Sequence, residues 1–241
     1  MRKEYYGLKP VRHSPFDMKE GKKRKIFVER IPGPFATLYE KAAVTALGTY
    51  YVPLAEEVVS GLGAGRILDL GTGPGYLPIE IVKRSAAIRV DGIDLSRRLI
   101  EIAISNASRA GLARQLHFEV GDASGLRFEN GTYDLVISTG MFHSLKDPVR
   151  VLKECRRVLK RGGQAWIYDP AQLASLIDLR QWKARFTAWE RLMYVLFVPF
   201  EKINPGRSYN REEIGVMIDA AGFNKYEIQV QNDELKIKLQ K

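Results

Sequence analysis

Hydrophobic and polar positions change their periodicity several times along the chain, and each change predicts a new element. Between residues 66 and 169, short apolar runs alternate with segments whose apolar residues recur every three or four positions. The first pattern is typical of buried strands and the second of amphipathic helices. Their alternation predicts parallel βαβ units with right-handed crossovers. The expected strands are 66–70, 88–94, 115–121, 133–139 and 164–169, and the expected helices are 75–85, 97–110 and 147–160.

The segments on either side of this alternation follow other patterns. Residues 34–60 have apolar positions at helical spacing and predict two short helices divided near Pro53. A further helix is expected at 210–221. The last two runs of the chain alternate strictly between apolar and polar residues, which predicts an antiparallel hairpin that completes the sheet. The hairpin strands are 224–231 and 234–240.

The chain is organised around the junction between the first expected strand and the helix after it. Residues 66–76 read Arg-Ile-Leu-Asp-Leu-Gly-Thr-Gly-Pro-Gly-Tyr, with three glycines at alternate positions. Glycine permits positive φ and leaves no Cβ between the backbone and a ligand. The following helix directs its unpaired N–H groups and its positive dipole end at this loop. The junction therefore predicts a site for a small polar ligand held against bare backbone.

Two features of the loop narrow the class of ligand. Its Gly-x-Gly-x-Gly spacing is not followed by Gly-Lys-Ser/Thr, which disfavours a triphosphate-binding loop. The spacing also differs from the Gly-x-Gly-x-x-Gly of dinucleotide sites, and Asp69 would repel a pyrophosphate, so a nicotinamide dehydrogenase is disfavoured. A carboxylate at this place suits a ligand that carries an amino group.

Each of the first three expected strands ends in an acidic residue: Asp69, Asp94 and Asp122. The carboxyl ends of parallel strands meet at the crevice where doubly wound sheets bind ligands. Asp94 stands where an acid accepts hydrogen bonds from both ribose hydroxyls, and Asp122 with the N–H of Ala123 suits an adenine edge. Structural alternatives exist for all three: a cap of the glycine loop for Asp69, a cap of the next helix for Asp94, and a turn for Asp122.

Taken together, these motifs resemble those of class I S-adenosylmethionine-dependent methyltransferases, in their small-molecule branch. The resemblance spans the region 35–170 and resumes at 208–241. It implies a Rossmann-like, doubly wound α/β fold with a seven-stranded, mostly parallel sheet in the order 3-2-1-4-5-7-6, whose last strand is antiparallel. The matching segments are Leu68-Asp69-Leu70-Gly71-Thr72-Gly73-Pro74-Gly75, Gly92-Ile93-Asp94-Leu95-Ser96, Gly121-Asp122-Ala123, Tyr133-Asp134-Leu135-Val136, Val158-Leu159-Lys160-Arg161-Gly162-Gly163 and Ala220-Ala221-Gly222-Phe223.

The resemblance also implies the cofactor S-adenosyl-L-methionine, which leaves as S-adenosyl-L-homocysteine. The methionine end is expected at Asp69 and the glycines, the ribose at Asp94 and the adenine at Asp122. Tyr76 either lies along the methionine moiety or is a packed aromatic. The expected cofactor-binding residues are Asp69, Gly71, Thr72, Gly73, Gly75, Tyr76, Asp94, Leu95, Asp122, Ala123 and Thr139. No metal is expected, since the single cysteine and the three histidines show no ligand spacing.

Methyl transfer from a sulfonium mainly needs an acceptor that is close, aligned and desolvated. A general base is needed only where the acceptor arrives protonated. The expected place for a base is the end of the fourth strand, where His143 is the candidate. The alternative role for His143 is to line or cap the next helix. Met141 and Phe142 are expected to form a wall beside the cofactor.

Two absences in the sequence bear on the kind of acceptor. The loop after the fourth strand lacks the Asp/Asn-Pro-Pro-aromatic tetrad of amino-methylating nucleic-acid enzymes. Cys155 lies inside an expected helix, which disfavours a cysteine nucleophile. The cysteine set of arsenite methylation is also absent.

Charge is distributed unevenly along the chain, whose formal net charge is +10. Residues 1–30 hold ten basic and four acidic residues, and residues 171–211 hold seven and three. These segments either meet an anionic partner or form a solvated basic surface. We expect 1–60 to form an N-terminal arm with lid helices and 61–241 to form the methyltransferase domain. The aromatic, helical insertion 171–209 is expected to be a lid, a membrane-interfacial helix or a dimer contact.

The sequence thus predicts a methyltransferase for a small, apolar or aromatic acceptor, acting as a monomer or homodimer. The alternatives are an RNA methyltransferase that uses the basic ends and a non-catalytic S-adenosylmethionine-binding protein. A cytoplasmic location is expected, because no signal peptide is visible, one cysteine suits a reducing compartment and no apolar run is long enough to span a bilayer. Peripheral membrane contact remains compatible with the sequence.

Overall fold

The computed structural model describes residues 33–170, 209–231 and 234–241. The expected basic arm and almost all of the expected insertion at 171–209 lie outside these residues. The expectations for both segments therefore stay predictions.

The described residues form alternating strands and helices, much as the hydrophobic pattern predicts. The strands are β1 (Gly65–Leu70), β2 (Ile88–Asp94), β3 (Leu116–Val120), β4 (Tyr133–Thr139), β5 (Leu159–Pro170), β6 (Lys225–Gln231) and β7 (Glu234–Gln240). The α-helices are α1 (Gly33–Thr45), α2 (Val52–Leu62), α3 (Tyr76–Arg84), α4 (Arg97–Arg109), α5 (Pro148–Val158) and α8 (Arg211–Ala220). Two short turns complete the set, a π-helical turn η1 (Leu47–Tyr51) and a 3-10 turn η2 (Phe142–Ser144).

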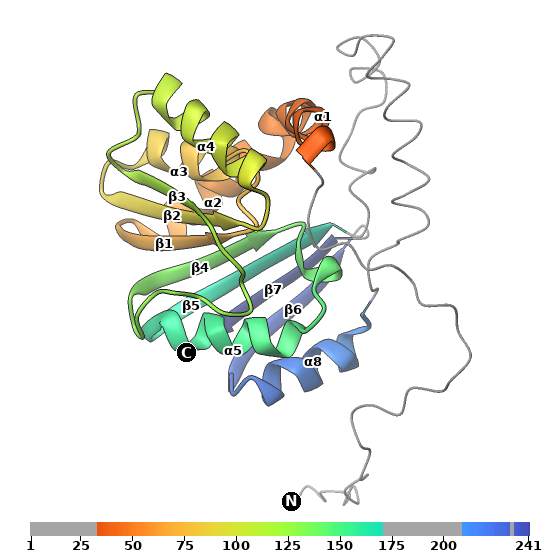
Figure 1. Ribbon diagram of the computed structural model, residues 1–241. Coiled ribbons are helices and arrows are strands. Elements are labelled where there is room, and N and C mark those ends of the chain that lie inside the picture. The colour runs from red at the N-terminus through yellow and green to blue at the C-terminus, as the bar shows by residue number, and fades with distance from the viewer. Residues whose placement is uncertain (1–32, 171–208, 232–233) are drawn as a thin grey trace, which may run out of the picture.

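A seven-stranded sheet in the order β3-β2-β1-β4-β5-β7-β6 forms the centre of the molecule. Strands β1 to β5 pair in parallel, and β7 is antiparallel to both β5 and β6. Figure 1 shows α2, α3 and α4 over one face of the sheet and α5 and α8 over the other. The expected α/β fold, strand order and terminal hairpin are confirmed.

Side chains on the strands alternate between two hydrophobic cores, one on each face of the sheet. Ile67 of β1 packs in the core that includes α2 and α3, whereas Leu68 and Leu70 pack in the core that includes α5 and α8. Asp69, two residues beyond Ile67, therefore faces α2 and α3. This alternation decides which helices surround the acid at the end of β1.

Two element boundaries differ from the sequence expectations. The break between the first two helices lies at η1 and not at Pro53, because Pro53 occupies the first turn of α2, where a missing N–H breaks no helical hydrogen bond. The expected helix 147–160 ends at Val158. Leu159 pairs with Tyr133 of β4, and this pairing draws the chain into β5 earlier than the glycines at 162 and 163 suggested.

The start of α8 lies where the sequence predicts it, at the expected N-cap residue Asn210. Asn210 is its N-cap, and the Asn210 side chain accepts a hydrogen bond from the backbone N–H of Glu213 at 2.9 Å. In return, Glu213 Oε2 accepts from the backbone N–H of Asn210 at 2.9 Å. This capping box fixes the helix that closes the sheet against α5.

Candidate functional site

The loop between β1 and α3 is held in a backbone conformation that favours glycine. Gly71, Gly73 and Gly75 have φ values of 70°, 54° and 79°. The backbone N–H of Thr72 donates to the carbonyl of Ile93 at 2.9 Å, which ties the loop to the end of β2. This backbone hydrogen bond holds the loop against β2. The glycines avoid the strain that a residue with a side chain would have at positive φ.

The same glycines allow close packing around the loop. A Cβ at Gly71 would lie 2.9 Å from Sδ of Met141, which follows β4. A Cβ at Gly75 would lie 3.0 Å from Ala103 of α4 and 3.0 Å from the ring of Phe118 in β3. The loop therefore presses against α4, β3 and the end of β4, and it brings these elements to one place.

Asp69 is a buried acid directly before the glycines, and 3% of its surface is exposed. Its Oδ2 accepts a hydrogen bond from the Thr72 hydroxyl at 2.7 Å, so the expected alternative of a loop cap describes a real contact. Burial raises the pKa of Asp69 to about 7, the Thr72 bond opposes this rise and the charge of Asp94 adds to it. A buried carboxylate in this state is stabilised by a cationic partner, and an ammonium group would supply one.

Asp94 joins the glycine loop to the start of α4. Its Oδ2 accepts from the backbone N–H of Gly73 at 3.0 Å and its Oδ1 from that of Ser96 at 2.8 Å. Burial raises the pKa of Asp94, and these two N–H groups oppose the rise. Ser96 is the N-cap of α4 and makes no side-chain cap bond, and Asp94 bonds the N–H of this residue without capping the helix itself. Each carboxylate oxygen keeps a second acceptor position, which is compatible with a role toward ribose hydroxyls.

The third acid, Asp122, is exposed in the link after β3. Its Oδ1 accepts from the backbone N–H of Ser124 at 2.8 Å, which is the turn contact that its structural alternative describes. Ala123 is buried in the core on the α5 side of the sheet. Gly121 donates its N–H to the carbonyl of Asp94 at 3.1 Å, so this link is attached to the ribose candidate. The adenine assignment stays a prediction.

The remaining expected residues lie at the same edge of the sheet. Leu95 is half-buried between β2 and α4, and Thr139 is half-buried at the end of β4. Thr139 pairs in register with Tyr168 of β5. The strand ends thus gather the expected cofactor residues along one edge, from β3 across β2 and β1 to β4.

Tyrosines of η1 and of the start of α3 pack together, and Tyr51 among them lies near Asp69. The rings of Tyr51 in η1 and Tyr76 at the start of α3 have centroids 6.2 Å apart, and Tyr50 meets Tyr51 edge-on at 5.4 Å. Burial raises the pKa of Tyr51, and the charge of Asp69 contributes to the rise. Burial also raises the pKa of Tyr76 to about 12. Sequence reasoning missed Tyr51, although the Tyr-Tyr pair at the interruption of the helical pattern was a signal.

His143 and Asp169 form a pair at the ends of β4 and β5. Nδ1 of His143 lies 2.7 Å from Oδ1 of Asp169, and the backbone N–H of His143 donates to Oδ2 at 2.6 Å. Asp169 is 4% exposed, and His143 is half-buried. The sequence pattern did not single out Asp169, although it stands directly before Pro170 at the carboxyl end of β5.

The two residues before His143 do not form the expected wall together. Met141 contacts Gly71 and so borders the loop. Phe142 is 2% exposed and packs in the core, with its ring centroid 5.6 Å from that of Tyr209. Met141 precedes the 3-10 turn η2 and Phe142 begins it, and the first side chain lies at the loop whereas the second lies in the core.

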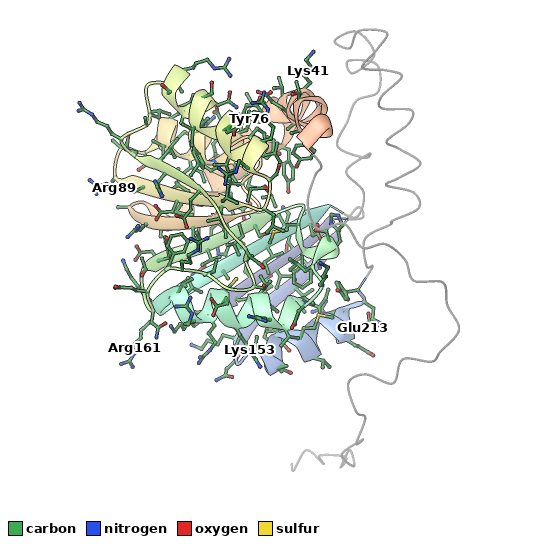
Figure 2. All side chains as sticks on the ribbon, in the orientation of Figure 1. Lys41, Tyr76, Arg89, Lys153, Arg161 and Glu213 are labelled. Atoms are coloured by element: carbon green, nitrogen blue, oxygen red, sulfur yellow. The ribbon has the colours of Figure 1, made fainter. Side chains whose placement is uncertain are left out.

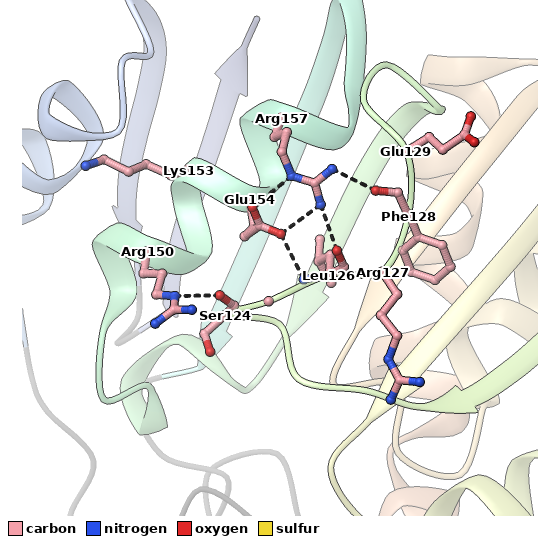
Figure 3. A pocket seen from close by; sticks show the side chains of 10 residues that line it. Ser124, Leu126, Arg127, Phe128, Glu129, Arg150, Lys153, Glu154 and Arg157 are labelled. Atoms are coloured by element: carbon pink, nitrogen blue, oxygen red, sulfur yellow. Dashed lines mark hydrogen bonds and ion pairs between the residues drawn. The ribbon is translucent and has the colours of Figure 1, made fainter.

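A hollow of about 610 Å³ opens on the other side of the β3–β4 link, against α5 (Figure 3). Arg157 donates to Glu154 and to the carbonyls of Leu126 and Phe128, and Arg150 donates to the carbonyl of Ser124 at 2.7 Å. These bonds attach the link to α5 and so brace the segment that carries Asp122. Figure 2 shows Lys153 of α5 far from Tyr76, on the opposite side of the sheet. We interpret the hollow as a brace, separate from the loop site.

Other kinds of site find little support in the described ranges. Within residues 33–170, 209–231 and 234–241, no group of three His, Cys, Asp or Glu side chains lies where it could hold a metal ion. Cys155 is buried in α5, and burial raises the pKa of its thiol to about 12, so the thiol stays protonated. None of the helices that the structure describes has both the length and the apolar character needed to cross a membrane.

The sheet order and the glycine loop with its acids define the class I methyltransferase fold. Residues 67–163 match the model of a methyltransferase domain family. The chain is similar to a solved candidate S-adenosylmethionine-dependent methyltransferase from Methanococcus maripaludis, with a TM-score of 0.71 and 24% identity over 93% of this chain and 97% of that chain. At this identity the likeness establishes the fold.

Among curated proteins, the chain is similar to a demethylmenaquinone methyltransferase of Thermotoga maritima. The two are 32% identical over 113 residues, which cover 47% of each protein. A ubiquinone biosynthesis O-methyltransferase of Leptothrix cholodnii is 29% identical over 113 residues, covering 47% of this chain and 46% of that protein. The chain thus matches about half the length of these curated relatives.

Proposed function

We propose that this protein is an S-adenosylmethionine-dependent methyltransferase that acts on a small, apolar or aromatic acceptor. The observation that carries the proposal is the glycine loop at 71–75, which contacts a buried acid at the end of β1 and is hydrogen-bonded to another at the end of β2. These acids stand on neighbouring strands of a methyltransferase fold, one suited to an ammonium group and one to a ribose. The match of residues 67–163 to the model of a methyltransferase domain family supports the proposal.

Each end of this cofactor is assigned to described residues. Asp69 would hold the ammonium group, Asp94 the ribose hydroxyls, and Asp122 with Ala123 and Leu95 the adenine. The glycines would let the ligand approach the backbone, with Tyr76 and Thr139 at its sides. When bound, S-adenosylmethionine supplies a methyl group that is already activated by the sulfonium charge.

The acceptor class rests on the surroundings of the loop and on the relatives. Met141 contacts Gly71 of the loop, and Tyr76, which follows the loop directly, packs with Tyr51. The two curated relatives are named for demethylmenaquinone and for ubiquinone biosynthesis, which supports a ring-containing, apolar acceptor. His143 is proposed as the base that takes a proton from a protonated acceptor. Selection among acceptors is assigned to the arm and to the insertion at 171–209.

The proposed function is tested by following tritium from methyl-labelled S-adenosylmethionine. The acceptors offered to the full chain are a demethylated naphthoquinol with an isoprenoid side chain, a substituted catechol and a structured RNA. We expect label in the quinol or catechol product. Label in the RNA would instead support the alternative that uses the basic ends. Cofactor binding without label in any acceptor would support a non-catalytic binding protein.

The affinity for S-adenosylhomocysteine is expected to rise with pH up to about 7. The pKa of Asp69 is raised to about 7 by burial, and only its ionised form compensates the ligand's ammonium group. Below pH 7 the affinity should fall by up to about tenfold per pH unit. Calorimetric titrations between pH 5.5 and 7.5 measure this. Asp69→Asn, which cannot ionise, should bind weakly at every pH in the range, and an equally flat profile for the unmodified chain would contradict the assignment.

Folding stability without ligand should show the opposite trend. Because the folded protein keeps the Asp69 proton up to about pH 7 and an unfolded aspartate releases it near pH 4, the folded state binds more protons between these values. The free energy of unfolding should therefore lose this contribution as pH rises from about 4 to about 7, and the loss should level off above 7. The difference between the chain and Asp69→Asn, measured by urea unfolding, isolates this residue.

A further inference from the structure

The buried carboxylate of Asp169 is directed at one residue. Both of its described hydrogen bonds go to His143, one to the backbone N–H and one to ring Nδ1. The side chain of Asp169 is 6% exposed, whereas that of His143 is 35% exposed. A carboxylate removed from water requires compensating donors, and here His143 supplies two. The pair therefore places a buried acid behind a ring that reaches the surface of the site.

The hydrogen bonds determine which ring nitrogen carries the proton. An ionised carboxylate only accepts hydrogen bonds, so Nδ1 must be the donor in the contact with Oδ1. The neutral ring then has its lone pair on Nε2. In such pairs the carboxylate fixes both the tautomer and the orientation of the ring. Nε2 of His143, on the side of the ring away from Asp169, is therefore the nitrogen that can accept a proton.

The turn that carries His143 is held between the glycine loop and β5. Gly140 has a φ of 66° and donates its N–H to the carbonyl of Tyr168 at 2.8 Å. Met141 contacts Gly71, and its carbonyl accepts from the backbone N–H of Ser144 at 2.9 Å. The pair is thereby placed one strand away from the loop that would hold the methyl donor.

A purely structural role for Asp169 would be to cap the η2 turn. Such a cap needs only the bond from the backbone N–H of His143 to Oδ2. It does not account for the second bond, 2.7 Å long, to the side chain of the same residue. The two roles differ in whether Asp169 controls the ring, and this difference can be measured.

We infer that Asp169 is a positioning residue that holds His143 in the Nδ1–H tautomer and so makes Nε2 the proton acceptor of the reaction. The inference rests on the proposed function. A protonated acceptor loses a proton to Nε2, and the acceptor atom forms a bond to the methyl carbon. The bond between that carbon and the sulfonium sulfur breaks, its electron pair stays on sulfur, and the imidazolium later returns the proton to water.

The first test is the tautomer itself, observed by two-bond nitrogen–proton correlation spectra of the full chain labelled with nitrogen-15 in histidine. The chain has three histidines, so His143→Gln identifies the signals of His143 by their loss. We expect a protonated Nδ1 and an unprotonated Nε2 in the neutral ring. A protonated Nε2, or an even mixture, would overturn the inference without any variant of Asp169.

The second test compares variants in cofactor binding and turnover. His143→Gln should lower kcat by about 10²- to 10⁴-fold, the range typical of general acid–base groups. Asp169→Asn, which retains an oxygen for the turn, should lower kcat by about tenfold or more and lose the single tautomer. Both should bind S-adenosylhomocysteine like the unmodified chain. Asp219→Asn removes an exposed acid from α8 and serves as the matched control.

The outcomes separate this inference from the proposed function. If Asp169→Asn keeps both the tautomer and kcat, Asp169 is only a turn cap. If the unmodified chain methylates no acceptor, the proposed function fails, whereas the tautomer result still decides whether Asp169 orients His143. If Asp169→Asn does not fold, the tautomer of the unmodified chain remains the deciding measurement.

Discussion

Replacing Gly75 with alanine is expected to destabilise the protein by about 2–5 kcal/mol. Gly75 has a φ of 79°, and an L-residue in the left-handed region costs about 1–2 kcal/mol. The new Cβ would also lie 3.0 Å from both Ala103 and Phe118, and overpacking of this kind costs about 1–3 kcal/mol. The change in free energy of unfolding is measured by urea denaturation.

Gly111 offers a matched control for this substitution. Its φ is 71°, and a Cβ there would meet no heavy atom within 4 Å. Gly111→Ala should therefore show only the backbone cost of about 1–2 kcal/mol. Equal losses at Gly75 and Gly111 would contradict the claim that the loop is pressed against α4 and β3.

Replacing Asp94 with alanine is expected to weaken S-adenosylhomocysteine binding by about 1.5–3 kcal/mol, roughly 10- to 150-fold. The carboxylate binds the N–H groups of Gly73 and Ser96, and in the proposed complex it also accepts from the ribose hydroxyls. Its loss therefore removes charge-assisted bonds to the ligand and loosens the loop. Calorimetric titration of the folded variant measures the change.

Two controls separate these effects of Asp94. Asp134→Ala removes an acid near the start of β4 that pairs with Lys160 at 2.8 Å. It lies at the amino ends of the parallel strands, away from the glycine loop, so the affinity for the ligand should not change. A 2′-deoxy analogue of the ligand should bind the unmodified chain more weakly than the ligand itself. The affinity of Asp94→Ala for the analogue and for the ligand should differ little, because the variant has already lost the hydrogen bond between the carboxylate and the 2′-hydroxyl. Full additivity of the two losses would refute the ribose assignment.

The sequence carries most of the fold because its signals are local. Strand and helix periodicity places nearly every element, and Asn210 with Glu213 predicts the start of α8 down to its capping bonds. The order of the strands is not local, and it came from the resemblance of the motifs. The early start of β5 was missed because it depends on the pairing of Leu159 with Tyr133, which no local pattern contains.

The candidate site also combines features that local sequence signals predict with features that depend on non-local contacts. The acids at 69 and 94 follow from their places at strand ends, but whether each contacts backbone or ligand depends on loop geometry. Asp69 bonds the Thr72 side chain and Asp94 bonds backbone N–H groups, and the cofactor contacts of both acids stay predictions. The contact between His143 and Asp169 joins residues 26 positions apart on neighbouring strands. Only the arrangement of β4 beside β5, with the turn at Gly140, brings them together.

The central claim is that the glycine loop and the acids at 69 and 94 form a binding site for the methyl donor. Isothermal titration of the full chain with S-adenosylhomocysteine tests it most directly. We expect saturable binding of one ligand per chain, strengthening as pH rises from 5.5 to 7 and weakened in Asp94→Ala. A folded chain that releases no heat, and whose melting temperature does not rise with the ligand, would contradict the claim.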